Sequence, residues 1–592
     1  MLKGDVTSIR QEIDNAEDFR DSHLEQWRNL ISRYHGPAFR KNDDEEDDPE
    51  NFVHEYIALI LPRIVHDNPK IRVKSMRPMV QGIASDLMQV GLNRWCRMTN
   101  IRTTLERIAT DMLLGFGVGM VVNEPRRGYR FADDSDPYLP RLYRISPDRF
   151  FIDPAATSIE DARYMGHCYI VDKEDLLEQA KTEDGWNVEL IEGMAENSGI
   201  DEIRESSKGD RTISDRGELV IYEVWVPEIR DEKVEVLDSS IGVYNAPMNM
   251  FNGTIYTILK HQSETKDGTK KVASFVREPR TYWGPRSGPY EVFGVYSVPD
   301  DPYPLSPLVA LLPQIDDLNS HLRSMRYSAS AYKRVIMVDS RNQQLAKDIQ
   351  DKDDLFVVLA DGIDPSQVVP VEVGGITTQQ VTYAQQAQDR LDRVSGIHDA
   401  MRGNVSGSAT ATEISIAEGA SGVRLSHIKK QFQESVNRVI RSVAWFMFHD
   451  QKIEFPVGED GIPILGAYPD PVFSARSMVG AFDDLDLQIE AMSMERVSEQ
   501  MMQRRSLELL QIIGNIAGAV IQAPHVKWDQ VLSFVGDAMN IPNLSDMIDV
   551  NAGQQMRDQM MTQQAQSGVV RPAKSEQVIQ GPSSFSKGSL GS

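Results

Sequence analysis

The sequence predicts an α+β protein made of several packed units. Two long stretches, residues 7–34 and 412–448, repeat apolar side chains every three or four positions, as amphipathic helices do. Between them, residues 141–298 contain short β-rich runs broken by Pro, Gly and Asp. A chain of 592 residues also exceeds the roughly 250–300 residues that a single hydrophobic core can organise.

Helices are expected to dominate the N-terminal part, starting with the one over residues 7–34. The acidic run 43–48 follows, and consecutive like charges of this kind are typical of a solvated loop rather than a metal site. A second helix is predicted over residues 52–61, ended by Pro62. A third is predicted to run without interruption over residues 79–114.

Three glycines, Gly115, Gly117 and Gly119, suggest a phosphate-binding loop at first sight. The third glycine falls one residue early for GxGxxG, and the order is helix, glycines, strand. A dinucleotide site needs strand, glycines, helix, because the helix N-terminus must face the pyrophosphate. We therefore expect a tight connection from a helix to a short strand at residues 120–123.

The β-rich region is followed by a helix and a small acidic module. The strands predicted within it are residues 142–145, 164–171, 219–226, 254–259 and 272–276. A proline cluster at 299–307 ends the region, and a helix is predicted over 308–333. Three short strands, residues 335–338, 355–359 and 368–373, come next. Eight acidic and three basic residues lie between Asp339 and Glu372, so the module is acidic.

The helix predicted over residues 377–397 is unusually polar, with glutamines around a thin stripe of Ala384, Ala387, Leu391 and Val394. A helix this poor in large apolar side chains cannot be buried in the core of one chain, so we expect it to pack against copies of itself or to line water. A loop of small residues, 403–410, joins it to the long helix over 412–448.

The C-terminal part is predicted to return briefly to strands over residues 452–489. Helices with apolar spacing follow at 497–520 and 528–539. From residue 554 onward the chain is rich in Gln, Met, Gly and Ser and has few core-forming side chains. We expect this tail to become ordered only against a neighbour.

Charge and cysteine content restrict the function classes. The formal charge of −25 argues against a broad basic surface that grips DNA phosphates, but not against a surface along which DNA slides. Cys96 and Cys168 are too few for a disulfide framework or a multi-cysteine zinc site, and we expect buried, reduced thiols. The longest apolar stretch, 112–122, is about half of the roughly 20 residues that a membrane span requires, and the N-terminus has no signal-peptide pattern.

No enzyme motif is found, so we expect no catalytic activity and no cofactor or metal. The sequence has no Gly-Lys dipeptide, which a phosphate-binding P-loop requires, and no HExxH, CxxC or GxSxG. The alternative is a magnesium-dependent nuclease using Asp483, Asp484 and Asp486, of which the last two share one face of a predicted strand. Exposed strands produce the same pattern far more often.

Several motifs, in this order along the chain, resemble the portal proteins of tailed bacteriophages, the rings through which DNA enters and leaves the capsid. They are residues 111–119 (DMLLGFGVG), 144–154 (RISPDRFFIDP) with 161–164 (DARY), 311–319 (LLPQIDDLN), and 395–403 (SGIHDAMRG) with 406–413 (SGSATATE). The resemblance covers about residues 50–450. The tail after Gln554 departs from it, because it is too short and polar for the helical barrel of some portals.

The resemblance implies a portal-like subunit in a dodecameric ring at one capsid vertex, with an axial channel for double-stranded DNA packaging and ejection. The regions it implies are a wing (1–307), a first stem helix (308–338), a clip (339–374), a second stem helix (375–397), a tunnel loop (398–411), a long wing helix (412–450), wing strands (451–490), crown helices (491–553) and a polar tail (554–592).

The resemblance also implies partners and site residues in a virion assembled in the host cytoplasm. The expected partners are other copies of the chain, DNA without sequence preference, the terminase large subunit, adaptor or tail proteins, and major capsid and scaffolding proteins, with no membrane. The clip docking residues are Asp351, Asp353, Asp354, Asp361 and Asp364. The channel residues are Met401, Arg402, Gly403, Asn404, Ser406 and Ser408. Arg402 is the side chain expected to touch the DNA backbone. The rival class is another oligomeric head-to-tail connector or tail protein, although adaptors are usually shorter.

Overall fold

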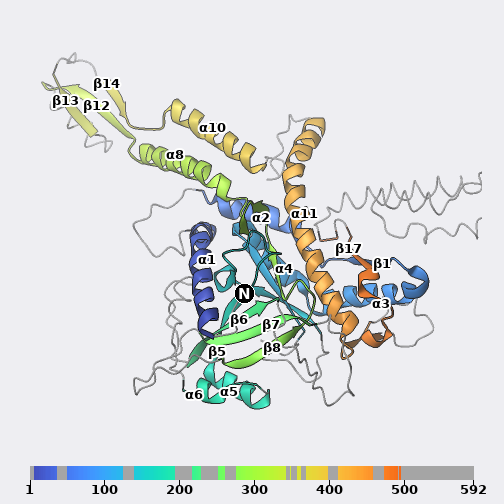
Figure 1. Ribbon diagram of the computed structural model, residues 1–592. Coiled ribbons are helices and arrows are strands. Elements are labelled where there is room, and N and C mark those ends of the chain that lie inside the picture. The colour runs from blue at the N-terminus through green and yellow to red at the C-terminus, as the bar shows by residue number, and fades with distance from the viewer. Residues whose placement is uncertain are drawn as a thin grey trace, which may run out of the picture. The chain divides into compact units, whose positions relative to one another are not determined.

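The computed structural model confirms the α+β class (Figure 1). It describes residues 6–36, 50–123, 139–183, 185–193, 217–227, 251–259, 275–341, 344, 347, 356–361, 369–397, 411–457, 472–490 and 493–494. The chain divides into two compact units, Met1–Arg496 and Val497–Ser592, and every described residue belongs to the first. The predicted crown helices and tail therefore lie outside the described residues, apart from 493 and 494.

The first helix, α1 (Val6–His35), confirms the helix predicted over 7–34 and connects two cores. Its first half inserts Ile9 and Ile13 into a cluster that covers one side of a β-sheet. Its second half inserts Leu24 and Leu30 into the main core. Because one apolar stripe serves both clusters, α1 holds them in a fixed relation.

The second helix, α2 (Phe52–Ile64), does not end at Pro62 as predicted. Pro62 lies inside the last turn, and the backbone N–H of Val65 still donates to the carbonyl of Leu61 over 2.9 Å. A proline so close to the end removes only one hydrogen bond. Burial of Ile60 and Ile64 in the main core outweighs that loss.

The single helix predicted over 79–114 is also wrong, because the chain forms two helices there, α3 (Pro78–Met98) and α4 (Ile101–Leu114). The break is at Asn100, whose φ of 46° is left-handed. Asparagine tolerates this conformation better than most residues. Periodicity alone could not show the break, since apolar positions continue on both sides of it.

The glycine segment connects α4 to β2 (Gly117–Val122), as expected, although the strand begins earlier than predicted. Gly117 is required by close approach, because a Cβ there would lie 2.5 Å from the carbonyl oxygen of Ile108. Strand β2 is the centre of a three-stranded antiparallel sheet in the order β3 (Arg141–Ile145), β2, β9 (Tyr290–Phe293). The glycines therefore bring helix and sheet together rather than binding phosphate.

The β-rich region forms a five-stranded antiparallel sheet. Its order is β4 (Phe150–Ile152), β5 (Met165–Asp172), β6 (Glu218–Val226), β7 (Phe251–Leu259) and β8 (Arg277–Trp283). The predictions for β3, β5, β6 and β7 are confirmed, whereas the strand placed at 272–276 is wrong where it is described, since β8 starts only at Arg277. Two helices that were not predicted, α5 (Lys173–Thr182) and α6 (Val188–Glu192), pack on this sheet through Leu176 and Ile191.

Strands from distant parts of the chain also pair. Strand β1 (Ile71–Ser75) pairs antiparallel with β17 (Leu485–Ile489), with Val73 opposite Leu487. Smaller pairs are β10 (Tyr296–Val298) with β11 (Asp301–Leu305), and β15 (Glu454–Pro456) with β16 (Val472–Ser474).

Both cysteines are buried and neither forms a disulfide. Burial raises the pKa of the Cys168 thiol to about 12, so it stays protonated near neutral pH.

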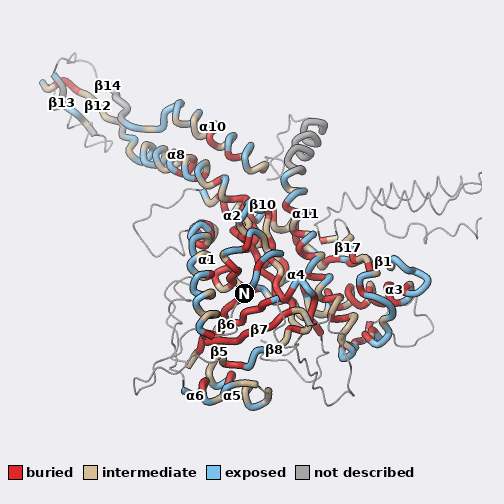
Figure 2. The backbone as a smooth tube through the Cα atoms, in the orientation of Figure 1, coloured by how far each residue is buried: buried red, intermediate tan, exposed pale blue. Residues whose placement is uncertain are grey.

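The long helix α11 (Ala411–His449) supplies the centre of the main core. Among the side chains described in it, the buried apolar ones are Ile428, Phe432, Val436, Val439, Ile440, Val443, Ala444, Phe446 and Met447. They pack against α2, α3, β2, β9 and β17. Figure 2 shows the burial concentrated where these elements meet. Among the described helices, none combines the length and apolar character needed to cross a bilayer.

An ion pair between the exposed Arg144 and the buried Asp111 fixes α4 to β3. The Arg144 guanidinium donates to both carboxylate oxygens of Asp111, over 2.5 and 2.8 Å. Burial raises the pKa of Asp111 from 3.8 to about 6, although Arg144 lowers it and Asp148 adds a smaller upward effect. The folded carboxyl therefore binds its proton more tightly than the unfolded one. The bound proton therefore adds to the free energy of unfolding. This contribution is complete at pH values below the pKa of Asp111 in the unfolded chain, and it is lost as the pH rises through about 6.

Replacing Arg144 with methionine should lower the free energy of unfolding by about 3 kcal/mol near pH 8, because a buried carboxylate loses its partner. The loss should shrink at pH 5, where Asp111 is protonated. Urea unfolding followed by circular dichroism at both pH values measures this. The double variant Asp111→Asn, Arg144→Met, which leaves no unpaired charge, is the control, and it should lack the part of the pH dependence that Asp111 causes. An equal loss at pH 8 and pH 5 for the single variant would contradict the argument.

Candidate functional site

Two antiparallel helices form a hairpin with a small sheet at its far end. They are α8 (Leu312–Ser330), which follows a 3₁₀ turn, Val309–Leu311, and α10 (Thr378–Ser395). Between them lie β12 (Lys333–Asp339), β13 (Phe356–Ala360) and β14 (Val369–Val373), in the order β13, β12, β14, with β12 parallel to β13 and antiparallel to β14. The helices at 308–333 and 377–397 and all three strands are thereby confirmed in type (Figure 1).

Polar and aromatic contacts align the two helices of the hairpin. The Tyr383 ring lies 4.1 Å from the ring of His321, and its hydroxyl donates to Asp317 over 3.2 Å. Within α10, the Arg390 guanidinium lies 5.5 Å from the centre of the Tyr383 ring, in cation–π range, and so supports the ring that contacts α8. These contacts determine the register of α10 on α8 without a large apolar interface.

The start of α10 is determined by local sequence. Thr377 and Gln380 form a reciprocal capping box, which satisfies two backbone N–H groups at the helix start. Gly374 and Gly375 precede it with φ values of 82° and 95°, a left-handed conformation that glycine adopts without strain. The N–H of Gly375 donates to the Ser328 carbonyl over 3.0 Å, so the chain returns from the small sheet directly onto the end of α8.

The base of the hairpin is attached to the N-terminal helices. Arg33, at the end of α1, lies 2.5 Å from Asp316. The Asn319 side-chain amide donates to the Glu50 carbonyl and accepts from the Glu50 N–H, over 3.2 and 3.3 Å. Ile315 and Leu318 of α8 and Leu391 of α10 are buried in the main core. The rest of α10 is mostly exposed (Figure 2), as its polarity predicts.

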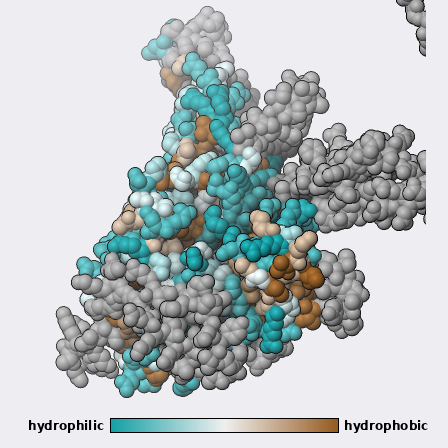
Figure 3. Space-filling view, turned by 45° about the vertical axis from the view of Figure 1, so that its right-hand side comes forward, coloured by the Kyte–Doolittle hydropathy of each residue, from teal (hydrophilic) through white to brown (hydrophobic). Residues whose placement is uncertain are grey.

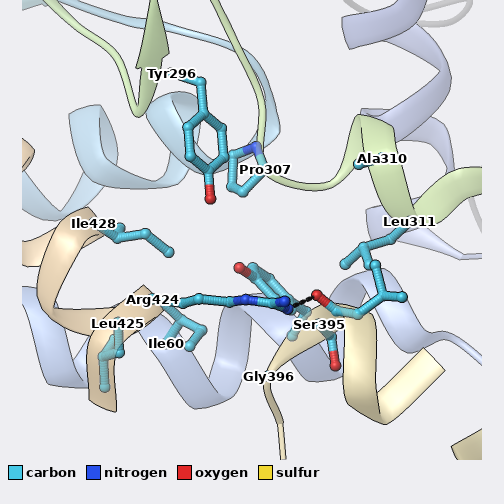
Figure 4. A pocket seen from close by; sticks show the side chains of 12 residues that line it. Ile60, Tyr296, Pro307, Ala310, Leu311, Ser395, Gly396, Arg424, Leu425 and Ile428 are labelled. Atoms are coloured by element: carbon cyan, nitrogen blue, oxygen red, sulfur yellow. Dashed lines mark hydrogen bonds between the residues drawn. The ribbon is translucent and has the colours of Figure 1, made fainter. Parts of the chain in front are cut away.

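The end of α10 lies in a small pocket of about 170 Å³ against α11 (Figure 4). Gly396 ends the helix with a φ of 74°. The Arg424 guanidinium donates to the carbonyls of Arg393, over 3.1 Å, and of Val394. Arg424 therefore caps α10 from another helix, at the point where the predicted tunnel loop begins. A glycine after a helix is a signal that the sequence offers, but nothing marks Arg424 as its partner.

Most of the candidate site residues lie outside the described residues. Among the clip positions, Asp351, Asp353, Asp354 and Asp364 are not described, whereas Asp361 lies in an exposed turn after β13 and accepts a hydrogen bond from the Ser340 hydroxyl. The channel residues Met401, Arg402, Gly403, Asn404, Ser406 and Ser408 are likewise outside the described ranges. What is described is the frame that brackets this loop: Ile397, buried at the end of α10, and the backbone of α11 from Ala411.

The carboxylates of the nuclease alternative do not form the predicted face. Asp483 and Asp484 lie in a 3₁₀ turn, and only Asp486 belongs to β17. Asp484 lies 3.5 Å from Arg77, and Asp483 lies 3.5 Å from Arg441. Within the described ranges, no group of three or more His, Cys, Asp or Glu side chains is placed to hold a metal ion. The acidic run 43–48 lies outside those ranges.

Comparison with known proteins adds no relative, since the chain matches no protein-family model and no curated protein is similar enough to count as a match.

Arg424→Met should loosen the end of α10, because it removes the donor to two terminal carbonyls. We expect faster amide exchange at Gly396 and Ile397, measured by hydrogen–deuterium exchange, with little change in the global unfolding temperature. Arg424→Lys, which keeps a charged donor, is the matched control and should recover part of the protection. Unchanged exchange in the methionine variant would show that Arg424 does not hold this helix end.

Proposed function

We propose that this chain is the subunit of a phage portal, a closed ring whose channel passes double-stranded DNA. The observation that supports this most is the hairpin of α8 and α10, which contributes to the subunit's core only at its base and carries a small sheet at its far end. A polar helix pair of this kind buries little apolar surface within one subunit, so packing inside that subunit stabilises it only weakly. Such a helix pair suits a ring in which copies of the chain stand side by side around water or DNA.

Under this proposal the described elements take the roles that the resemblance implies. Helices α8 and α10 would be the stem, β12 to β14 the clip, and α11 the long wing helix. The clip would dock terminase during packaging and tail or adaptor proteins afterwards, and residues 398–411 would face the DNA. No catalytic residue is assigned. The rival connector or tail protein would share the ring but would not be required for packaging.

The purified chain should form closed rings with a central hole, because the outer face of α10 needs neighbours or solvent rather than a core. Negative-stain microscopy and native mass spectrometry, near neutral pH and at several salt concentrations, measure this directly. Only monomers or dimers at high protein concentration would overturn the proposal.

Shortening the predicted tunnel loop by deleting Gly403–Gly407 should leave rings intact but reduce the DNA content of assembled heads, because the segment has small side chains and no core residues. Arg402→Ala should act in the same direction and more weakly. Arg102→Ala, at an exposed arginine of α4, is the matched control and should give full heads. Full, stable heads in both loop variants would exclude a channel role for this segment, and loss of rings would make it a structural element.

A further inference from the structure

A pocket of about 640 Å³ lies beside the second half of α11. Its other walls include residues 285–287, in the turn between β8 and β9, and residues 480–483, which lead into β17. Figure 3 shows apolar surface gathered on the side of the molecule that carries α3, but no described residue of α3 lines this pocket. The volume lies within the roughly 300–1,000 Å³ that is typical of small-molecule sites.

The charged side chains of the described lining are mainly basic. Arg286, Arg438 and Arg441 line the pocket together with Asp483. Asp483 lies 3.5 Å from Arg441, and both side chains are mostly exposed, so this pair is weak. Arg438 is held by Glu291 over 2.5 Å, whereas no described carboxylate pairs with Arg286. Even with Glu291 counted, three guanidiniums stand against two carboxylates, on a chain whose formal charge is −25.

Hydrogen-bond donors in the lining also lack protein partners. The hydroxyls of Ser287 and Ser442 and the indole N–H of Trp445 form no hydrogen bond within the described part of the chain. An indole N–H or a guanidinium can only donate, so a ligand that satisfies these groups must supply acceptors. Asp484, the next carboxylate along the chain, lies 3.5 Å from Arg77 and does not line the pocket. The described lining therefore favours an anion over a cation.

Aromatic rings form much of the remaining wall. Trp445 packs edge to face on Trp283, with 5.1 Å between ring centres, and Phe448 packs in the same way on Phe482 over 5.7 Å. These contacts hold the rings in place before a ligand arrives. Burial lowers the pKa of His449, which also lines the pocket, so its ring is mostly neutral near pH 7. Rings beside guanidiniums suit a ligand in which a flat aromatic group is joined to an anion.

We infer that this pocket binds a nucleotide, with Arg286 and Arg441 on its phosphate and the aromatic wall beside its base. The inference goes beyond the proposed ring and does not depend on it. A neutral apolar ligand would cover the guanidiniums without pairing them, which is costly. An inorganic anion would leave the aromatic wall uncovered. A phosphate joined to a base satisfies both parts, because phosphate oxygens accept from more than one guanidinium at a time.

Titration calorimetry of the full chain with AMP, adenosine and ribose 5-phosphate tests the two parts of the ligand separately. AMP should bind with a dissociation constant below about 1 mM. Adenosine, which lacks the phosphate, and ribose 5-phosphate, which lacks the base, should each bind at least about tenfold more weakly. A strand of five deoxyadenosine nucleotides identifies the source of the ligand: tighter binding than AMP indicates a nucleotide of a single strand, and weaker binding indicates a free nucleotide.

Arg286→Gln combined with Arg441→Gln removes two exposed guanidiniums from the lining. The affinity for AMP should fall at least about tenfold, while the unfolding temperature and the weak adenosine binding stay unchanged. Arg102→Gln combined with Lys430→Gln removes the same charge at exposed positions outside the lining and is the matched control. It should bind AMP as the wild type does.

Several results would overturn the inference and leave the proposed ring standing, since ring formation is measured separately. They are no binding of AMP by the wild type up to about 1 mM, ribose 5-phosphate binding as tightly as AMP, and undiminished AMP affinity of the lining variant. An equal loss of affinity in the control would show a general effect of charge. Tighter binding of N-acetylphenylalanine than of AMP would assign the pocket to an acidic peptide instead of a nucleotide.

Discussion

Packing of the apolar stripe of α11 is the interaction on which the other described elements depend. Phe432, Val436 and Ile440 are inaccessible to solvent and lie among elements that the chain makes far earlier, α2, α3 and β2, and one that it makes later, β17. Because a single helix fills the space between them, the three-stranded sheet and the β1–β17 pair share one core. Burial of a large apolar side chain in such a position contributes about 1.5–3 kcal/mol to the free energy of unfolding.

This packing also determines where the hairpin can begin. Leu391 and Ile397 reach the same core from α10, and Leu311 and Ile315 reach it from the turn before α8 and from α8 itself. Beyond Leu318 of α8 and Ala387 of α10, which are also in the core, the described parts of the two helices bury no further apolar side chain, so their alignment there depends on contacts such as those of Tyr383 with His321 and Asp317. The hairpin is therefore firmly attached at its base, and its exposed outer surface remains open to neighbours.

The sequence predicted those elements whose patterns are local. The stripes of α1 and α11 and the polarity of α10 each lie within one stretch of chain, and the helices predicted from them are confirmed. The errors arise where tertiary packing competes with a local rule. Burial of Ile64 carries α2 past Pro62, and Asn100 breaks a helix whose periodicity continues.

Long-range features of the site could not be predicted in the same way. Pairing of β1 with β17 joins residues about four hundred positions apart, and no short-range pattern specifies it. The contact of Arg424 with the end of α10 likewise depends on the path of α11. The order of elements from α8 to α11 was predictable because each is separately patterned, whereas their mutual contacts required the fold.

The distribution of charge gives the hairpin a further property that suits the proposed channel. Its helices contain equal numbers of acidic and basic side chains: Asp316, Asp317, Arg323 and Arg326 in α8, and Asp389, Arg390, Asp392 and Arg393 in α10. The chain around them has a net charge of −25. A strongly basic wall would bind phosphates and slow DNA, because each neutralised phosphate adds affinity, whereas a strongly acidic wall would oppose its entry. Helices whose charges cancel avoid both effects, so α8 and α10 can face DNA as a surface that neither holds nor excludes it.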